Sequence, residues 1–323
     1  MTERLADPLT RQRSNLRRQS ETIAFIIMIA ALVVAPFVTY PLFLMQVLCF
    51  ALFACAFNLL IGYVGLLSFG HALYFGWASY LSAYAMKAWG LTPELAILTG
   101  TLTAAVCGIV AGSLAIRRQG IYFAMITLAL AQMMYFVAVR SKFTGGEDGI
   151  QAVPRGHLLG LIDLRNEWAM YIVVVAIFLG GFMLIYRIIH SPFGEVLKAI
   201  RENETRAISL GYKTDRYKLI AFVLSATLAG VAGSTKAIVV GIASLTDVNW
   251  PMSGEVVLMS LVGGLGTIFG PVVGSVVIVT MQYQFAFLGE WVLVIQGVIF
   301  VICVLVFRRG IVGEIANRLR IRL

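Results

Sequence analysis

The chain has 323 residues, of which 60% are hydrophobic and 13% are charged, and its formal net charge at pH 7 is +9. A soluble domain carries about 45–50% apolar and about 25% charged residues, so this composition excludes a soluble globular protein. Repeated apolar runs predict an all-α fold, a polytopic integral membrane helical bundle of about 8–10 transmembrane or re-entrant helices. The predicted spans are 23–39, 42–62, 65–86, 93–115, 120–140, 168–188, 218–242, 256–283 and 290–307.

The chain begins with a basic segment, residues 1–22, which contains no apolar block and carries the arginines Arg4, Arg11, Arg13, Arg17 and Arg18. A basic lead before an apolar run is typical of a signal peptide, but no small-x-small cleavage pattern follows it closely. We therefore predict an uncleaved first helix with a cytoplasmic N-terminus. A single transmembrane domain is expected over 23–307, followed by a basic cytoplasmic tail over 308–323.

Most lysines and arginines gather in four places: 1–22, 117–118, 187–218 and 308–322. All four lie on the cytoplasmic side if the spans alternate from an inside N-terminus, as the positive-inside rule requires. The net positive charge therefore reflects membrane topology, and nucleic acid is not an expected partner.

The span 256–283 conflicts with this topology if it crosses the membrane once, because the basic tail would then lie outside. The span is too long for one helix and is interrupted by "GGLGTIFGP". We predict a re-entrant or broken hairpin with its tip at 263–271 and no net crossing. Irregular backbone at membrane depth persists only where protein or a water-lined cavity satisfies its polar groups, so the interruption indicates a pathway.

A second interruption, "GLLSFGHALYFG", occupies a similar position in the first half of the chain. Paired interruptions are typical of a transport site, although glycines also serve close helix packing. His71 either lines the path or satisfies a backbone carbonyl left free by the helix break. Lys236 is expected to extend to the membrane interface, with a gating role as the alternative. The predicted pathway residues are Ser68, Phe69, Gly70, His71, Phe75, Gly264, Gly266, Phe269 and Gly270.

A charged segment, residues 191–217, interrupts the apolar sequence of the second half. Ser191 is a good N-cap, and Pro192 suits the first helical position. A second short helix, about Glu204–Leu210, is expected to end at Gly211 in a left-handed conformation. The segment either lies on the lipid headgroups or docks in a groove of a partner protein. The first helix carries an apolar stripe formed by Phe193, Val196, Leu197 and Ile200.

The charged segment resembles the cytoplasmic coupling loop of ABC importer permeases, which docks in a cleft of the ATP-hydrolysing subunit. With "NLLIGYVGLLSFGHALYFGWASYLSA" (58–83), "TGGEDGI" (144–150) and "GGLGTIFGPVVGS" (263–275), the chain is similar to Liv-type branched-chain amino-acid permeases, and most similar to their M subunits. The chain departs from the general loop at Arg206, where alanine is usual. The resemblance implies that the coupling loop functions through Glu195, Arg201, Glu204, Ala207 and Gly211.

The resemblance also implies a function. The chain is expected to be the permease subunit of an ABC importer in a bacterial inner membrane, with both termini cytoplasmic. Leu, Ile or Val would be delivered by a periplasmic binding protein. A second homologous permease and two ATPase subunits are the other implied partners, and ATP would be used by the ATPase subunits. The alternatives are a urea, amide or other small-solute permease of the same fold, and an ATP-independent carrier or channel.

Several chemistries are not expected. The sequence contains no Gly-Lys pair, so the P-loop of an ATPase is absent. An enzyme in the membrane would need clustered titratable groups, whereas the three histidines, His71, His157 and His190, belong to separate regions. We therefore predict no catalytic residue, no metal site and no cofactor. The cysteines are expected to act as small core hydrophobes. The external loop 141–167 is expected to form turns and, secondarily, to contact a binding protein.

Overall fold

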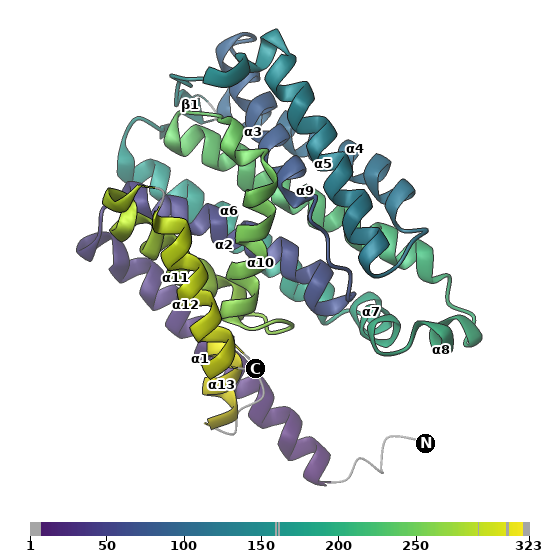
Figure 1. Cartoon of the computed structure of the whole chain (residues 1–323). Helices are drawn as coiled ribbons and strands as arrows, with labels where there is room; N and C mark the ends of the chain where they lie inside the picture. Colours follow the sequence, from purple (N-terminus) through teal and green to yellow (C-terminus); the bar gives the residue numbers. More distant parts are fainter. Residues whose placement is uncertain (1–7, 159, 161, 290, 308–309, 319–323) are drawn as a thin grey trace.

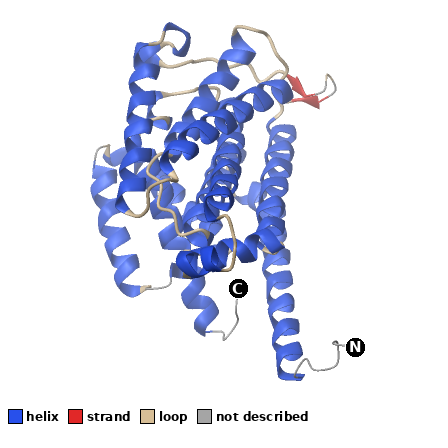
Figure 2. Cartoon of the chain, turned by 90° about the vertical axis from the view of Figure 1, so that its right-hand side faces the viewer, coloured by secondary structure: helices blue, strands red, loops and turns tan. Residues whose placement is uncertain are grey.

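The computed structural model describes residues 8–158, 160, 162–289, 291–307 and 310–318. Helices dominate it, and consecutive long helices run in opposite directions (Figure 1, Figure 2). The helices are α1 (Pro8–Val38), α2 (Pro41–Tyr63), α3 (His71–Lys87), α4 (Pro93–Ala115), α5 (Ile121–Arg140), α6 (Glu167–Ile189), α7 (Pro192–Glu202), α8 (Glu204–Ser209), α9 (Thr214–Val240), α10 (Trp250–Gly263), α11 (Gly270–Phe285), α12 (Trp291–Val306) and α13 (Gly310–Arg318).

The bundle has two ends that differ in structure. The short helices α7 and α8, the start of α1 and the last helix, α13, lie at one end, which we call the α7 end (Figure 1). The opposite end, the β1 end, carries a small antiparallel sheet in which His157 of β1 pairs with Asp163 of β2. Its short elements are η1 (Lys142–Thr144), η2 (Gly146–Asp148), β1 (His157–Leu158), β2 (Ile162–Asp163), η3 (Leu245–Asp247) and η4 (Ala286–Leu288).

Seven helices of the described chain are long and apolar enough to cross a membrane. Of these, α2 is central, because 83% of its most apolar window is buried, compared with 17% for α1. The outer helices expose large apolar side chains such as Phe37, Leu98 and Phe136. Such a surface fits hydrocarbon, where every backbone polar group must be bonded within the protein. The chain is therefore a multi-pass membrane protein, as the composition predicts.

Helices α3, α4 and α9 form a closely packed unit. Small residues make this possible, because a Cβ atom at Gly233 of α9 would overlap the backbone of Phe75 in α3. The hydroxyl of Ser79 also donates a hydrogen bond of 2.7 Å to the carbonyl of Gly233. Close backbone approach through small residues is the usual way in which helices associate in membranes. We call α3, α4 and α9 the three-helix unit.

Both predicted interruptions are present, with altered boundaries. The span expected over 65–86 begins as a helix only at His71, because residues 64–70 run as non-helical chain into the bundle. The span 256–283 is divided into α10 and α11, which pack against each other as a hairpin. At about 1.5 Å per residue, α10 measures roughly 21 Å, less than a bilayer core, whereas α11 together with η4 (Gly270–Leu288) is one of the seven segments long and apolar enough to cross a membrane. The hairpin tip, residues 264–269, lies at the α7 end (Figure 1).

The N-terminal helix is longer than the sequence predicts. Instead of starting near residue 23, α1 begins at Pro8 and includes most of the basic segment expected over 1–22. The basic tail expected over 308–323 includes α13, while residues 308–309 and 319–323 lie outside the described part of the chain.

Candidate functional site

The charged segment 191–217 folds as two short helices joined at Asn203. The hydroxyl of Ser191 accepts a hydrogen bond of 3.3 Å from the backbone amide of Gly194, which caps α7. The side chain of Asn203 caps α8 in the same way, through the amide of Arg206 at 2.9 Å. Both caps satisfy donors that a helix start leaves free. The predicted stripe of α7 is confirmed, since Leu197 and Ile200 are buried and Phe193 and Val196 are half-buried.

Glu204 is bonded within the chain. Its carboxylate pairs with the ammonium group of Lys218 in α9, whose side chain is only 3% exposed. It also accepts a hydrogen bond of 2.8 Å from the side-chain amide of Gln119, in the connection between α4 and α5. A buried lysine needs such a partner, because an unpaired charge away from water is costly. Glu204 therefore attaches α8 to the three-helix unit.

The residues of α8 divide into a buried and an exposed side. Ala207 is only 2% exposed, so it faces the chain itself. Ile208 and Leu210 are 56% and 69% exposed and present an apolar surface to solvent at the α7 end. Gly211 ends the segment with a backbone φ of +89°, as predicted, and a Cβ atom there would meet nothing within 4 Å.

Arg201 of α7 connects the charged segment to two irregular parts of the bundle. One guanidinium nitrogen donates a hydrogen bond to the carbonyl of Gly62, in the last turn of α2. Its side chain also lies against Gly65, where α2 has ended, and against Gly266 at the hairpin tip. Both interruptions therefore meet one side chain of the charged segment.

The hairpin tip is fixed by Asn58 of α2, a residue that is 2% exposed. The side-chain nitrogen of Asn58 donates a hydrogen bond of 2.9 Å to the carbonyl of Thr267. Its side-chain oxygen accepts one of 3.1 Å from the amide of Gly266. Thr267 also bonds within the tip, to the carbonyl of Gly264 at 2.7 Å. The irregular backbone of the tip is thus held by both polar atoms of one buried side chain.

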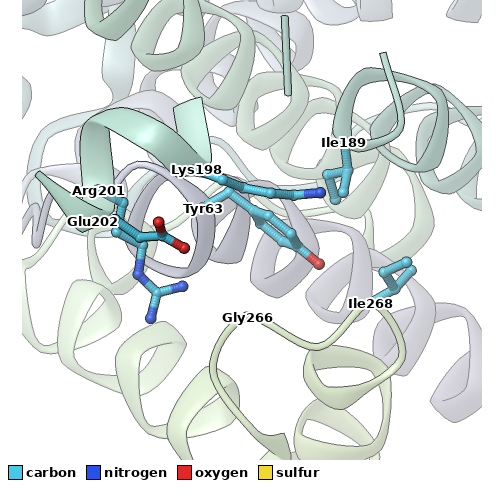
Figure 3. A pocket seen from close by; sticks show the side chains of 7 residues that line it. All are labelled: Tyr63, Ile189, Lys198, Arg201, Glu202, Gly266 and Ile268. Carbon is cyan, nitrogen blue, oxygen red and sulfur yellow. The ribbon is translucent and has the colours of Figure 1, made fainter. Parts of the chain in front are cut away.

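A cavity of about 520 Å³ lies where α7, the hairpin tip and the ends of α2 and α6 meet. Figure 3 shows Arg201 and Glu202 on one side of it, and Ile189 and Ile268 on the other. Both isoleucines are buried. The complete lining consists of Tyr63, Ile189, Lys198, Arg201, Glu202, Gly266 and Ile268.

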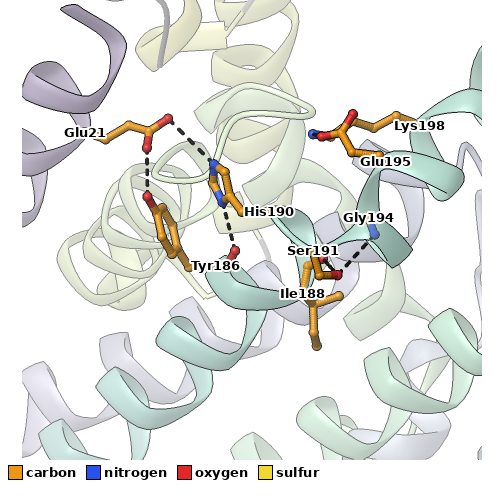
Figure 4. Close-up of polar contacts among 8 residues, drawn as sticks. All are labelled: Glu21, Tyr186, Ile188, His190, Ser191, Gly194, Glu195 and Lys198. Atoms are coloured by element: carbon orange, nitrogen blue, oxygen red, sulfur yellow. Dashed lines mark hydrogen bonds and ion pairs between the residues drawn. The ribbon is translucent and has the colours of Figure 1, made fainter. Parts of the chain in front are cut away.

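Glu195 lies on the exposed part of α7, where its carboxylate pairs with Lys198 at 2.8 Å. At the end of α6, the hydroxyl of Tyr186 donates a hydrogen bond of 2.8 Å to the carboxylate of Glu21 in α1 (Figure 4). His190 lies 3.8 Å from the same carboxylate, immediately before the N-cap of α7. These contacts fasten the junction of α6 and α7 to α1.

The pathway residues predicted from the first interruption lie inside the bundle. Phe69 donates its amide to the hydroxyl of Thr127 in α5 at 3.2 Å, and the amide of Gly70 is bonded to Ser68. Phe75 is fully buried and stacks on Phe53, with ring centroids 4.5 Å apart.

His71 holds α2, α3 and α9 together. The hydroxyl of Ser225 donates a hydrogen bond to the carbonyl of Ala56 at 2.5 Å, so it accepts from the Nε2–H of His71 at 2.9 Å. The ring of His71 makes edge contacts with Phe57 and Tyr74. The imidazole is therefore bonded to a hydroxyl and not directly to a backbone carbonyl, and Ala56 lies within the regular part of α2.

The second interruption packs against α1 and α6. The ring of Phe269 packs against Phe25 of α1 and Phe182 of α6, at centroid distances of 5.2 and 5.5 Å. Gly264 and Gly270 form the base of the hairpin tip. Of the nine predicted pathway residues, Gly266 alone lines the cavity. The described part of the chain therefore does not bring the two interruptions together in one cavity.

Lys236 has a partner that the sequence does not predict. Its ammonium group pairs with Asp247 of η3 at 2.7 Å, and its side chain is 12% exposed. The sequence shows no signal for this pairing, since the two residues are brought together only when η3 folds back over α3.

Comparison with known proteins decides the family. A model of the family described as branched-chain amino acid transport system, permease component, matches residues 40–304. The chain belongs to this permease family. The match covers all the helices described above except α1, α13 and the last residues of α12.

Named relatives agree with this family. The permease is 25% identical over 288 residues to LivM, the high-affinity branched-chain amino acid transport system permease protein of Salmonella typhimurium, covering 82% of this chain and 68% of the relative. LivM of Escherichia coli K12 gives the same values. The ribose import permease protein RbsC of Bacillus subtilis is 28% identical over 243 residues, or 68% of this chain and 70% of that one. No solved structure matches the permease.

The family is one of transport proteins rather than enzymes. Within the described residues of the permease, no group of three His, Cys, Asp or Glu side chains is placed to hold a metal ion. The four cysteines are free thiols, two of them buried: Cys49 and Cys55.

Sequence reasoning missed three polar residues of the permease. Asn58 lies within a predicted span, Lys218 at the start of another, and Gln119 in a short connection. A signal existed for Asn58 and Lys218, because a polar side chain inside a membrane span is rare and often functional. Gln119 carries no such signal, since polar residues are ordinary in loops.

Proposed function

We propose that this permease is a membrane-spanning subunit of an ABC importer for branched-chain amino acids, driven by separate ATPase subunits. The observation that carries the proposal is the charged segment. It exposes Ile208 of α8 and Leu210, the residue that follows α8, while Glu204 and Arg201 bind the segment to the bundle. An exposed apolar surface on a rigidly attached helix suits docking in a groove of a partner. A segment that merely lay on lipid would not need these buried attachments.

In this proposal the ATPase moves α7 and α8, and two contacts carry the movement inward. Glu204 transmits it to α9 through Lys218. Arg201 transmits it to the end of α2 and to the hairpin tip. Because Asn58 holds the tip to α2, a displacement of α7 is passed to irregular backbone inside the bundle. Irregular elements of this kind are where transporters build their gates.

The two interruptions are proposed to border the translocation pathway from different sides of α2, completed by a second homologous permease. The first contributes Ser68–Phe75 and the second Gly264–Gly270. A path lined mainly by apolar groups suits Leu, Ile or Val better than a highly charged solute. A periplasmic binding protein would deliver the solute to the β1 end, where the loop 141–167 lies.

The α7 end is proposed to be cytoplasmic in a bacterial inner membrane. The start of α1, the connection between α4 and α5, and the helices α7 and α8 lie at this end, and each belongs to one of the basic clusters of the sequence. A cytoplasmic excess of lysine and arginine is the rule in such membranes. The hairpin of α10 and α11 makes no net crossing, so α12 returns the chain to this same end.

Reconstitution tests the proposal. The permease with its partner permease, ATPases and binding protein is placed in proteoliposomes, and uptake of leucine, isoleucine, valine, urea and ribose is measured with and without ATP. We expect ATP-dependent uptake of the three branched-chain amino acids. Uptake of urea or ribose without leucine would overturn the choice of solute and leave the importer class intact.

The competing class of protein is a carrier that works without an ATPase. Co-purification distinguishes such a carrier from an ABC importer. Tagged permease is isolated from its native host in mild detergent and its companions are identified by mass spectrometry. We expect a P-loop ATPase in a fixed ratio. Its consistent absence, together with leucine uptake by the permease alone without ATP, would establish the carrier.

A further inference from the structure

The lining of the cavity at the α7 end includes two residues, Ile189 and Glu202, to which the proposed transport cycle gives no part. Its volume of about 520 Å³ falls within the range of roughly 300–1,000 Å³ that is typical of small-molecule sites. Arg201 and Glu202 supply opposite charges from adjacent positions in the last turn of α7. Glu202 makes no hydrogen bond or ion pair with any other described residue, and the guanidinium of Arg201 keeps further N–H donors beyond the one given to Gly62.

The third charged residue of the lining, Lys198, already has a partner of opposite charge. Lys198 pairs with Glu195 at 2.8 Å, so the cavity is left with one cation and one carboxylate. Across from them lie two buried aliphatic side chains, Ile189 and Ile268, which are 2% and 5% exposed (Figure 3). The cavity therefore offers a neutral pair of charges on one side and hydrocarbon on the other.

A free aliphatic α-amino acid has the same distribution of charge and hydrocarbon. It carries one carboxylate and one ammonium on a single carbon, and its side chain is apolar. We propose that the cavity binds such an amino acid from the solution at the α7 end. Its carboxylate is bound by Arg201, its ammonium by Glu202, and its side chain packs on Ile189 and Ile268.

Binding here has a consequence for transport, and this part of the inference rests on the proposed function. The walls of the cavity come from α7, the hairpin tip and the ends of α2 and α6. An amino acid inside it adds contacts between these elements and stabilises the arrangement in which they enclose it. A ligand that prefers one arrangement shifts the population toward that arrangement. Accumulated solute would therefore slow further import.

Equilibrium dialysis of the complete transporter with radiolabelled L-leucine tests the site, in the absence of binding protein and ATP. We expect saturable binding that unlabelled leucine displaces. Leucinol, which lacks the carboxylate, and 4-methylpentanoate, which lacks the ammonium, should not displace it. The Glu202→Gln variant should bind leucine about 10–100-fold more weakly, since it loses a charged hydrogen bond. The Asp215→Asn variant, an exposed carboxylate at the same end, is the matched control and should bind normally.

A second measurement separates this inference from the proposed function. Proteoliposomes are loaded internally with leucine and the initial rate of uptake is compared with empty vesicles. We expect internal leucine to slow the wild type and to have little effect on Glu202→Gln. Normal leucine uptake without saturable binding at this cavity would overturn the inference and leave the proposed function standing. Equal displacement by 4-methylpentanoate, or unchanged affinity in Glu202→Gln, would also overturn it. Glu202-dependent leucine binding in a transporter of another solute would support the site and refute the proposed function.

Discussion

Lys236 and Asp247 form a buried ion pair at the β1 end of the bundle. The ammonium group donates hydrogen bonds of 2.7 Å to both carboxylate oxygens, and the side chains are 12% and 2% exposed. Lys236 lies near the end of α9 and Asp247 in η3, so the pair fastens the three-helix unit to the segment that precedes α10. Removing either partner leaves a charge without compensation.

The first prediction follows from this pair. Lys236→Met or Asp247→Asn should each lower the free energy of unfolding by about 3–5 kcal/mol, the cost of leaving one buried charge unpaired. The double variant should recover much of that loss, because no charge is left. Thermal unfolding in detergent measures all three. The half-exposed pair Glu195–Lys198 is the control, and its removal should cost less than about 1 kcal/mol. Strictly additive losses in the double variant would contradict this account.

Glu204 is predicted to couple ATP hydrolysis to transport through its bond to Lys218. Glu204→Ala should raise the number of ATP molecules hydrolysed per solute imported, because α8 loses its attachment to α9. Adding Lys218→Met should restore stability, since the buried ammonium is gone, but not coupling. The measurement is ATPase activity and uptake in the same proteoliposomes. If Glu204→Ala hydrolyses the same number of ATP molecules per imported solute as the wild type, Glu204 has no part in coupling.

The exposed apolar residues of α8 are predicted to contact the ATPase. Ile208→Asp and Leu210→Asp should abolish or strongly weaken co-purification of the ATPase, because a charge would have to be desolvated at the interface. The permease itself should remain folded, since both side chains are mostly exposed. Ile208→Val and Leu210→Met, which keep the surface apolar, serve as matched controls. Full retention of the ATPase by both Asp variants would place the docking surface elsewhere.

Gly211 supplies a prediction about backbone conformation alone. Its φ of +89° disfavours a β-branched residue by about 1–2 kcal/mol, while its surroundings leave room for a side chain. Gly211→Val should therefore reduce transport, whereas Gly211→Asn should be tolerated, since asparagine adopts the left-handed region more readily. Uptake rates at matched expression measure the difference. Equal rates for both variants would show that the left-handed turn is not needed.

Cysteine labelling tests the orientation independently of the family. On a background without the four native cysteines, single cysteines at Arg118 and Lys213 should react with a membrane-impermeant reagent only from the cytoplasm. Cysteines at Glu147 and Gln284 should react only from outside. All four positions are exposed in the structure. Labelling of Gln284 from inside would show that the α10–α11 hairpin crosses the membrane once, and the proposed topology would have to be withdrawn.

Local signals predicted the charged segment well. The start of α7 is indicated by Ser191, whose side chain caps a helix, and by Pro192, whose φ is fixed near the helical value. The end of the segment is indicated by Gly211, which readily adopts the left-handed conformation. The interruption at Gly264 was predicted for the same reason. The earlier break is harder to place, because the irregular segment ends at two hydrogen bonds that the apolar pattern does not indicate. One is a tertiary bond from the amide of Phe69 to Thr127, and the other is a local bond from the amide of Gly70 to Ser68.

Contacts between distant residues were not predictable from one sequence. The pairing of Asn58 with Gly266 and of Lys236 with Asp247 depends on how helices are arranged, which no local pattern specifies. Ala207 shows a related limit. The resemblance to the coupling loop implied that Ala207 contacts the ATPase. On that view, a charged residue at this position would lose its water in the docking cleft. The residue is buried against its own chain, and an Ala207→Asp variant would act through that burial instead.

Asn203 lies between two short helices of the charged segment that are attached to different parts of the bundle. On one side of it, α7 is bonded through Arg201 to α2 and the hairpin tip. On the other side, α8 is bonded through Glu204 to α9. A change in the angle between these two short helices would therefore shift the hairpin tip and α2 relative to the three-helix unit. A partner that displaced the whole segment without changing this angle would shift both sets of helices together.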